Sequence, residues 1–571
     1  MKKIRKPDTN EIQYKIITHK RIAFVQFCVF LAFFILLVYL FSVQVFDFSG
    51  YKKQGIAIRN TSNLTLRGNI LDRNGLKLAT DELVYEIYAH PLLYSNKTSI
   101  NELAQKLSPY LNISTKDLVT LLNSKKINII TLKKGVNRKT ADEIKKLNLR
   151  EISVGTLNKR FYPQGCVASH ILGYYSHLSK NSIGIENIAN AQLSNIETSE
   201  SLQRRAGRGY IFDLKTDLNN VLTKQKGEDV QLTIDTFIQY ICEKELQKTI
   251  ATTRAERGSV IVMNVKNGEI LAYASSPNFD PNNFSKCNQL QMKNWSLTDI
   301  YPPGSTFKII TVATAMELGA INEHSKILDT GKIKIEGYEI KNYDYEKKPY
   351  PGYISLDYLF EHSSNVASAN LALMLNPNQY YSKLRDFGFG QKTNIDLTAE
   401  SIGLLPKPNQ WYKSRQASMG YGYGASVTAI QMVSAVSAIA NNGIWITPHV
   451  IKYSKEELPN HVTTRQVMSG KNAKSVTKLL AKSIENGNSV LKLDKYYVAA
   501  KTGTSRKEVT SGANVYTSAI GYFPASKPEI AIYVVIDSPK TGSDWGSTIA
   551  SPLFKEIAIE VANILCIPAD K

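Results

Sequence analysis

The sequence predicts an α+β fold that begins with a single N-terminal transmembrane helix. An uncharged apolar run occupies residues 22–43, and short strand-like and helical pieces with polar connections fill residues 46–225. Strand patterns then stand at both ends of residues 226–571, with helical patterns between them. Strands at the two ends of a domain and helices in its middle indicate an antiparallel sheet packed against helices.

The composition indicates a folded protein and argues against a nucleic-acid-binding one. The chain has 571 residues, of which 43% are hydrophobic and 21% are charged, so large packed cores are expected rather than disorder. Its net charge is +21, yet it has neither a basic stripe with interleaved aromatic residues nor a standard DNA- or RNA-binding signature. We therefore expect no nucleic-acid partner, and the evenly spread lysines suit anionic membrane and wall surfaces.

The N-terminal apolar run predicts a membrane anchor. Ile22 to Val43 carries no charged side chain, and about 20 such residues are enough to cross a bilayer as a helix. A cleaved signal peptide has a shorter core of about 7 to 15 residues, so we interpret residues 22–45 as an uncleaved anchor. The basic tail, residues 1–21, is kept in the cytoplasm by the positive-inside rule, which puts the rest of the chain outside.

Two domains are predicted after the anchor, over residues 46–225 and 226–571. The boundary rests on a polar, glycine-containing stretch over residues 199–229. In the first domain, Asn74-Gly75 between apolar runs is a hairpin signal. In the second, the expected strands cover 259–276 as a hairpin, then 496–500, 516–523 and 529–537, and a helix follows over 552–565.

A serine and a lysine stand three residues apart where a predicted buried helix begins. Pro302, Pro303 and Gly304 favour the start of a helix, and Ser305 and Lys308 would share one of its faces. Burial would lower the pKa of the lysine, so that its neutral amine could accept the serine proton. The spacing alone is weak evidence, because it recurs at Ser475/Lys478 and Ser489/Lys492 without such a helix start.

Two further motifs follow in a fixed order and make the pattern specific. Ser363-Ser364-Asn365 gives S-x-N, and Lys501-Thr502-Gly503-Thr504 gives K-T-G, which with S-x-x-K is the signature of penicillin-binding proteins and serine β-lactamases. S-x-N recurs at 179–181 and 368–370, so it is the least specific element. K-T-G recurs at 540–542, and we prefer the first copy because it continues a strand, whereas Pro539 precedes the second.

With these motifs, the chain resembles the class B penicillin-binding proteins, over nearly its whole length. Two N-terminal stretches add to the likeness: Arg67, Gly68, Ile70, Asp72, Arg73, Asn74 and Gly75, and then Tyr162, Pro163, Gly165, Ala168, His170, Gly173 and Tyr174. Residues 363–368, 422–443 and 521–539 are most similar to the division (septal) type. Ala500 before K-T-G and Ser505 after it depart from the family's usual glycine and alanine.

The resemblance implies a non-catalytic pedestal domain over residues 46–225 and a penicillin-binding, serine β-lactamase-like transpeptidase domain over 226–571. It implies that the protein cross-links peptidoglycan stem peptides through a serine acyl-enzyme, and that β-lactams target it. The implied roles are nucleophile for Ser305, base for Lys308, proton transfer for Ser363 with Asn365, positive potential for Lys501, and substrate binding for Thr502, Gly503 and Thr504. The backbone N–H groups of Ser305 and Thr504 would form an oxyanion hole.

Several alternatives remain open at this stage. An elongation-type transpeptidase shares the same motifs. A class A β-lactamase needs a glutamate for deacylation, but Ala372 holds that position before Leu375-Asn376. A β-lactam-sensing receptor carries its sensor domain on several membrane helices, whereas this sequence predicts one span. A catalytically inert division scaffold would not need a base beside a serine.

The resemblance also implies partners and a location. The expected partners are the membrane, peptidoglycan stem peptides, β-lactams, a multi-span glycan polymerase and other division proteins. The expected location is the bacterial inner membrane, with the catalytic domain on the periplasmic side at the septum.

No cofactor is expected. His170 lacks spaced partners, so no metal site is predicted, and the five scattered cysteines imply no disulfide framework.

Overall fold

The computed structural model describes residues 9–41, 66–94, 99–123, 129–177, 179–194, 226–347, 350, 352–487, 489–507, 514–541 and 544–571. It contains two compact units. The first comprises Met1–Leu64, Val84–Leu157 and Thr198–Thr216, and the second comprises Thr65–Leu83, Asn158–Glu197 and Asp217–Lys571. Most of the linker predicted over 199–229 lies outside the described residues, which resume at 226.

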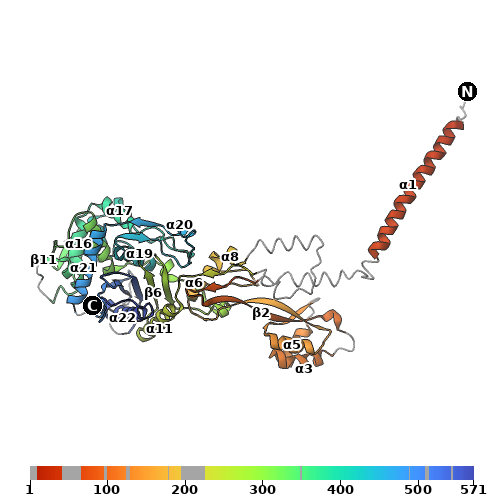
Figure 1. Ribbon diagram of the computed structural model, residues 1–571, viewed down its shortest axis with the longest axis horizontal. Coiled ribbons are helices and arrows are strands. Elements are labelled where there is room, and N and C mark those ends of the chain that lie inside the picture. The colour runs from red at the N-terminus through yellow and green to blue at the C-terminus, as the bar shows by residue number, and fades with distance from the viewer. Residues whose placement is uncertain are drawn as a thin grey trace. The chain divides into compact units, whose positions relative to one another are not determined.

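The first unit contains the N-terminal helix α1 (Thr9–Phe41), drawn in red in Figure 1. Its segment Arg21–Phe41 is long and apolar enough to cross a membrane, and none of it is buried inside the protein. This segment overlaps the predicted anchor as far as Phe41. Residues 42–45, where the anchor was expected to end, are outside the described part of the chain.

The remainder of the first unit is a small α/β region. Its three helices each begin at a serine or asparagine whose side chain accepts a hydrogen bond from a backbone N–H of the first turn: Ser99, Ser114 and Asn137. Leucines at helical spacing then bury one face of each of the first two helices. The elements are α3 (Ile100–Leu111), α4 (Thr115–Leu122), β3 (Ile130–Val136), α5 (Arg138–Lys146) and β4 (Ile152–Phe161), with η2 at Pro91–Leu93.

The second unit is built on a five-stranded antiparallel sheet in the order β14-β15-β16-β6-β7. Its strands are β6 (Arg257–Asn264), β7 (Ile270–Ser276), β14 (Ala499–Arg506), β15 (Val515–Phe523) and β16 (Ile530–Asp537). The sheet joins strands from the two ends of the predicted domain, as expected. Strand β16 is buried along its whole length, which indicates that both faces of the sheet are covered.

Helices cover both faces of this sheet (Figure 1). Val260 and Val262 of β6 belong to the core formed with α11 (Thr236–Thr253) and α22 (Gly546–Ile564). The alternate residues Ile261 and Met263 belong to the core formed with α14 (Lys308–Glu317), α19 (Ala429–Ala440) and α21 (Gly470–Asn486). The period of two along the strand therefore places neighbouring side chains in opposite cores.

Shorter elements complete the second unit. Its other helices are α6 (Ser169–Leu172), α7 (Ile185–Ile188), α8 (Asn190–Ser194), α12 (Gln289–Met292), α13 (Trp295–Thr298), α15 (Leu356–His362), α16 (Asn365–Leu373), α17 (Pro377–Asp386), α18 (Lys413–Met419) and α20 (Leu458–His461). The 3₁₀ turns are η3 (Pro281–Lys286), η4 (Gly304–Phe307) and η5 (Pro408–Gln410). The strand pairs are β8 (Lys326–Asp329) with β11 (Gly352–Ser355), β9 (Lys332–Ile335) with β10 (Tyr338–Lys341), and β12 (Ile444–Ile446) with β13 (Thr464–Gln466).

The hairpin predicted at Asn74-Gly75 is present. It joins β1 (Ile70–Leu71) to β2 (Lys77–Ala89), with Ile70 opposite Ala79. Gly75 has φ +87°, a conformation that residues with a Cβ atom rarely adopt. Strand β1 also pairs in parallel with β5 (Val230–Gln231), so the stretch that begins at Arg67 is joined to residues just after the boundary predicted near 226.

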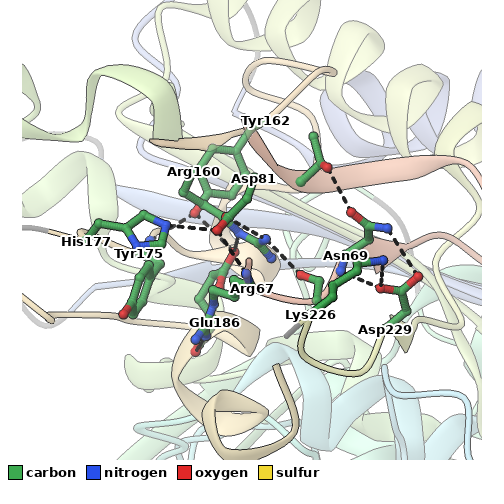
Figure 2. Close-up of polar contacts among 12 residues, drawn as sticks. Arg67, Asn69, Asp81, Arg160, Tyr162, Tyr175, His177, Glu186, Lys226 and Asp229 are labelled. Atoms are coloured by element: carbon green, nitrogen blue, oxygen red, sulfur yellow. Dashed lines mark hydrogen bonds and ion pairs between the residues drawn. The ribbon is translucent and has the colours of Figure 1, made fainter. Parts of the chain in front are cut away.

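Arg67 and Tyr162, one from each stretch that carries the N-terminal resemblance, belong to a buried network of polar contacts within the second unit (Figure 2). The carboxylate of Glu186 accepts hydrogen bonds from Nε of Arg67 and from Nε of Arg160, each at 2.6 Å. Arg160 also pairs with Asp81 at 3.1 Å, and Asp81 pairs with His177 at 3.1 Å. Although burial opposes it, the hydrogen bond from His177 and the charge of Arg160 hold the pKa of Asp81 below its ordinary value. The network joins two stretches that are far apart in the sequence.

Candidate active site

Ser305 lies in the turn that precedes a buried helix. The turn η4 carries Ser305, and α14 begins only at Lys308, so the two residues do not share one regular α-helix as the spacing predicted. A Cβ atom on Gly304 (φ +58°) would lie 3.0 Å from Cβ of Ser505 and 3.2 Å from the carbonyl oxygen of Thr504. The absence of a side chain at Gly304 therefore lets β14 pack closely against the serine turn.

Ser363 is held between two helices in a left-handed conformation. It ends α15 with φ +53° and ψ +43°, and Ser364 caps the start of α16. Non-glycine residues adopt this region rarely and at an energetic cost. The geometry places Oγ of Ser363 2.9 Å from Oγ of Ser305 and 3.1 Å from Nζ of Lys308.

Lys308 is fully buried, with 0% of its surface exposed. Its Nζ atom lies 3.1 Å from Oγ of Ser305, and it donates to the backbone oxygen of Ser363 at 2.5 Å and to Oδ1 of Asn365 at 2.8 Å. Burial lowers the pKa of Lys308 well below its ordinary value, the charge of Lys501 lowers it further, and Asp329 acts in the opposite direction.

These contacts suit a neutral amine. A carbonyl and an amide oxygen can only accept hydrogen bonds, so together they take both N–H groups of a neutral lysine. The amide of Asn365 is oriented for this, because its Nδ2 donates to the backbone oxygen of Lys341 at 3.1 Å. The lone pair of Nζ then remains for the hydroxyl of Ser305, because Ser363 donates its own hydroxyl hydrogen to Oγ of Ser305. The arrangement can remove a proton from a serine hydroxyl.

The preferred K-T-G motif lies on β14, an edge strand of the central sheet. Lys501 is buried, which lowers its pKa to about 8, and its Nζ donates to the backbone oxygen of Thr502 at 3.2 Å. A Cβ atom on Gly503 would lie 2.7 Å from Oγ of Ser518 and 3.0 Å from Cγ2 of Thr306, so this glycine also permits close packing on η4. Thr504 accepts a hydrogen bond from the backbone N–H of Gly546 at 3.0 Å.

The structure thus joins Ser305, Lys308, Ser363 and Asn365 by direct contacts. Lys501 acts on Lys308 through its charge, and Gly503 and Thr504 border the serine turn. Thr502 is half-buried on the same strand.

The other copies of the motifs have structural contacts. In the second K-T-G, the backbone N–H groups of Lys540 and Thr541 donate to the oxygen of Thr253 at the end of α11, while Gly542 lies outside the described residues. Ser475 donates to Glu323 at 3.0 Å, and Lys492 pairs with Glu485 at 3.1 Å. None of these contacts involves the Ser305 cluster.

His170 has no metal-binding partner set. Its Nε2 lies 2.8 Å from the backbone oxygen of Gln291, and burial lowers its pKa to about 4. Within the described ranges, no group of three or more histidine, cysteine, aspartate or glutamate residues could hold a metal ion. We interpret His170 as a structural residue.

Sequence reasoning missed two buried polar residues beside the S-x-N motif. Asn342 lies directly after β10 and contacts the start of α16, and Asp329 at the end of β8 contacts Asn342. Nothing in the local sequence marks them, because they come together only when two short strands fold beside α16.

Two family models match the chain. The penicillin binding protein transpeptidase domain matches residues 258–558, and the penicillin-binding protein dimerisation domain matches residues 63–211. The first match contains all three motifs, and the second contains the buried ion-pair stretches that begin at Arg67 and Arg160.

Similar proteins and structures point the same way. The peptidoglycan D,D-transpeptidase FtsI of Escherichia coli (strain K12) is 30% identical over 580 residues, which cover 100% of this chain and 95% of that protein. Stage V sporulation protein D of Bacillus subtilis (strain 168) is 32% identical over 511 residues, or 86% of this chain and 77% of that protein. The crystal structure of a peptidoglycan synthetase from Bifidobacterium adolescentis ATCC 15703 has 25% sequence identity and a TM-score of 0.65, covering 88% of this chain and 96% of that one. A dimerisation domain followed by a transpeptidase domain, with a 30% identical relative that matches the whole of this chain, shows that the chain belongs to the class B penicillin-binding proteins.

Proposed function

We propose that the protein is a serine-type D-alanyl-D-alanine transpeptidase that cross-links peptidoglycan and that Ser305 is its nucleophile. The observation that carries this proposal is the fully buried amine of Lys308 between the hydroxyl groups of Ser305 and Ser363. A scaffold or binding module has no need of a desolvated base in contact with two serines. The name of the full-length relative from Escherichia coli agrees with this activity.

In the acylation step, Oγ of Ser305 attacks the carbonyl carbon of the peptide bond between the two terminal D-alanines. Its proton passes to Nζ of Lys308, and the oxyanion accepts hydrogen bonds from the backbone N–H groups of Ser305 and Thr504. In well-studied serine hydrolases each such donor contributes about 2.7 to 4 kcal/mol. Ser363, which donates to Ser305 in the resting state, is placed to relay the proton to the leaving nitrogen.

Collapse of the tetrahedral intermediate breaks the C–N bond, releases D-alanine and leaves an ester on Ser305. The amine of a neighbouring stem peptide then attacks the ester and restores the serine hydroxyl. We assign the terminal carboxylate of the donor peptide to Thr502 and Thr504, with Lys501 supplying positive potential. Strand β14 carries all three residues, and its residue Thr504 borders the serine turn. A β-lactam carries an equivalent acyl group and carboxylate, so it would acylate the same serine.

We place the protein in the inner membrane by its N-terminal helix, with the tail in the cytoplasm and both later domains on the periplasmic side. Division is the role we favour, because residues 363–368, 422–443 and 521–539 resemble the septal type. The two domains matched by family models are a dimerisation and a transpeptidase domain, so we propose that a multi-span polymerase of the division machinery is the partner that supplies the glycan strands. The match to a sporulation protein keeps other wall-building roles as the alternative.

Substitution of the nucleophile tests the activity. The wild-type protein should gain the mass of a labelled penicillin on Ser305, whereas Ser305→Ala should gain none, because the alanine has no oxygen to acylate. Intact-mass and peptide analysis of both proteins after exposure to the drug measures this. Labelling of the alanine variant to the same extent would place the nucleophile elsewhere.

The two K-T-G lysines provide a matched pair of variants. Lys501→Ala should reduce the rate of acylation by about 100-fold, since it removes a buried charge next to the reacting groups. Lys540→Ala should react like the wild type, because Lys540 is 60% exposed and pairs only with Glu256. Stopped-flow acylation with a fluorescent penicillin measures both rates. The reverse order of effects would show that the second motif is the functional one.

Depletion of the protein in its host tests the division role. We expect filamentous cells that elongate without dividing, and a fluorescent fusion to the full chain should gather at midcell. The Ser305→Ala variant should localise equally well without restoring division, which separates placement from catalysis. Rounded cells with a dispersed signal would assign the protein to elongation instead.

A further inference from the structure

The S-x-N segment is held from behind by the side chain of Asn342. Oδ1 of Asn342 accepts hydrogen bonds from the backbone N–H groups of Asn365 at 2.8 Å and Val366 at 3.1 Å, and from the hydroxyl of Ser364 at 3.3 Å. Asn342 is only 4% exposed. One amide oxygen therefore fixes the first turn of α16. That turn begins at Asn365, whose side chain contacts Lys308.

Asn342 is in turn held by the carboxylate of Asp329. Nδ2 of Asn342 donates to both oxygens of Asp329 at 3.0 Å, and the backbone N–H of Gly331 donates to Oδ1 at 2.8 Å. Asp329 is 1% exposed, and no ion pair to it is found within the described part of the chain. Burying a carboxylate without a cationic partner costs free energy of folding. We therefore expect Asp329 to contribute to the arrangement of the site.

We propose that Asp329 and Asn342 form a positioning dyad for the catalytic cluster, in which Asp329 orients Asn342 and Asn342 fixes Ser363 and Asn365 against Lys308. The chain of contacts supports this step by step. Nδ2 of Asn342 donates to the two oxygens of Asp329, which turns the amide oxygen of Asn342 towards α16. That oxygen then fixes the segment from Ser364 to Val366, and the next residue back, Ser363, gives Lys308 its shortest hydrogen bond.

The dyad also supplies the negative charge that acts on the base. The charged groups that act on Lys308 are Lys501 of β14 and Asp329 of β8, with opposite effects. Asp329 also faces the phenols of Tyr350 and Tyr358, whose pKa values are raised by burial and by nearby acidic groups, so they stay neutral. Asp329 is therefore placed to oppose the desolvation of the Lys308 ammonium without contacting it.

An exchange of the two side chains tests the positioning. Asp329→Asn places an amide against an amide, and Asn342→Asp places a carboxylate against a carboxylate, so each single variant should be acylated by penicillin at least about 10-fold more slowly. The double variant restores one donor facing one acceptor, with Asn at 329 donating to Asp at 342. It should recover most of the lost rate. The assay uses the full-length protein in detergent.

The pH dependence of acylation gives a readout that a merely structural role would not move. Lys308 must be neutral to accept the proton, so the rate falls as the pH drops through its pKa. Asp329→Asn removes a negative charge that stabilises the ammonium, lowers that pKa and should shift the acid limb to lower pH. The midpoint of the limb does not depend on how much of the variant is folded.

Asn370 of α16 provides a matched control. Its Nδ2 donates to the backbone oxygen of Leu328 at 2.9 Å, so it also ties α16 to β8, but outside the Ser305 cluster. Asn370→Leu should leave the rate and the acid limb unchanged, whereas Asn342→Leu should lower the rate.

The inference rests on the proposed function, and the outcomes separate the two. A wild-type protein that penicillin does not acylate at Ser305 would overturn the function itself. If the wild type reacts, a folded double variant no faster than the single variants, or an Asp329→Asn variant with an unmoved acid limb, would overturn the dyad alone.

Discussion

The burial of one amine, Nζ of Lys308, determines how the rest of the site must be built. A charged ammonium without solvent is unstable, and the groups around it give it acceptors for two hydrogens rather than a carboxylate for a full charge. The charge of Lys501 makes the charged form of Lys308 still less favourable. In the proposed mechanism, a base therefore lies where Ser305 loses its proton.

Three separate parts of the chain must meet within hydrogen-bonding distance for this to work, and packing of the second unit brings them together. The central sheet presents β14, and α14 lies in the core that covers one of its faces. Gly304 and Gly503 allow the serine turn and the strand to approach more closely than residues with a Cβ atom would. Ser363 accepts an unfavourable backbone conformation between α15 and α16, which the contacts behind it stabilise.

The sequence predicted the parts of this site that are local. The strand patterns at the two ends of the domain, the helix starting near Lys308 and the order of the three motifs are visible in short windows. The dyad of Asp329 and Asn342 could not be predicted, since its members stand 13 residues apart in the chain and reach α16 only through tertiary packing. The 3₁₀ turn at Ser305 was missed as well, because a run of apolar residues does not distinguish it from the first turn of a helix. The ion pair of Arg67 also depends on a distant partner, so its motif could be noticed but not explained.

The protonation state of Lys308 is the central claim, and it can be measured directly. Lysine labelled with ¹³C at Cε would be incorporated into the full-length protein in detergent, and the signal that disappears in Lys308→Met would identify the residue. The account predicts that this signal titrates well below 10.5, the ordinary lysine value, in the ligand-free wild type. A Lys308 signal that titrates with the exposed lysines would show a resting ammonium, and would contradict the assignment of Lys308 as the base.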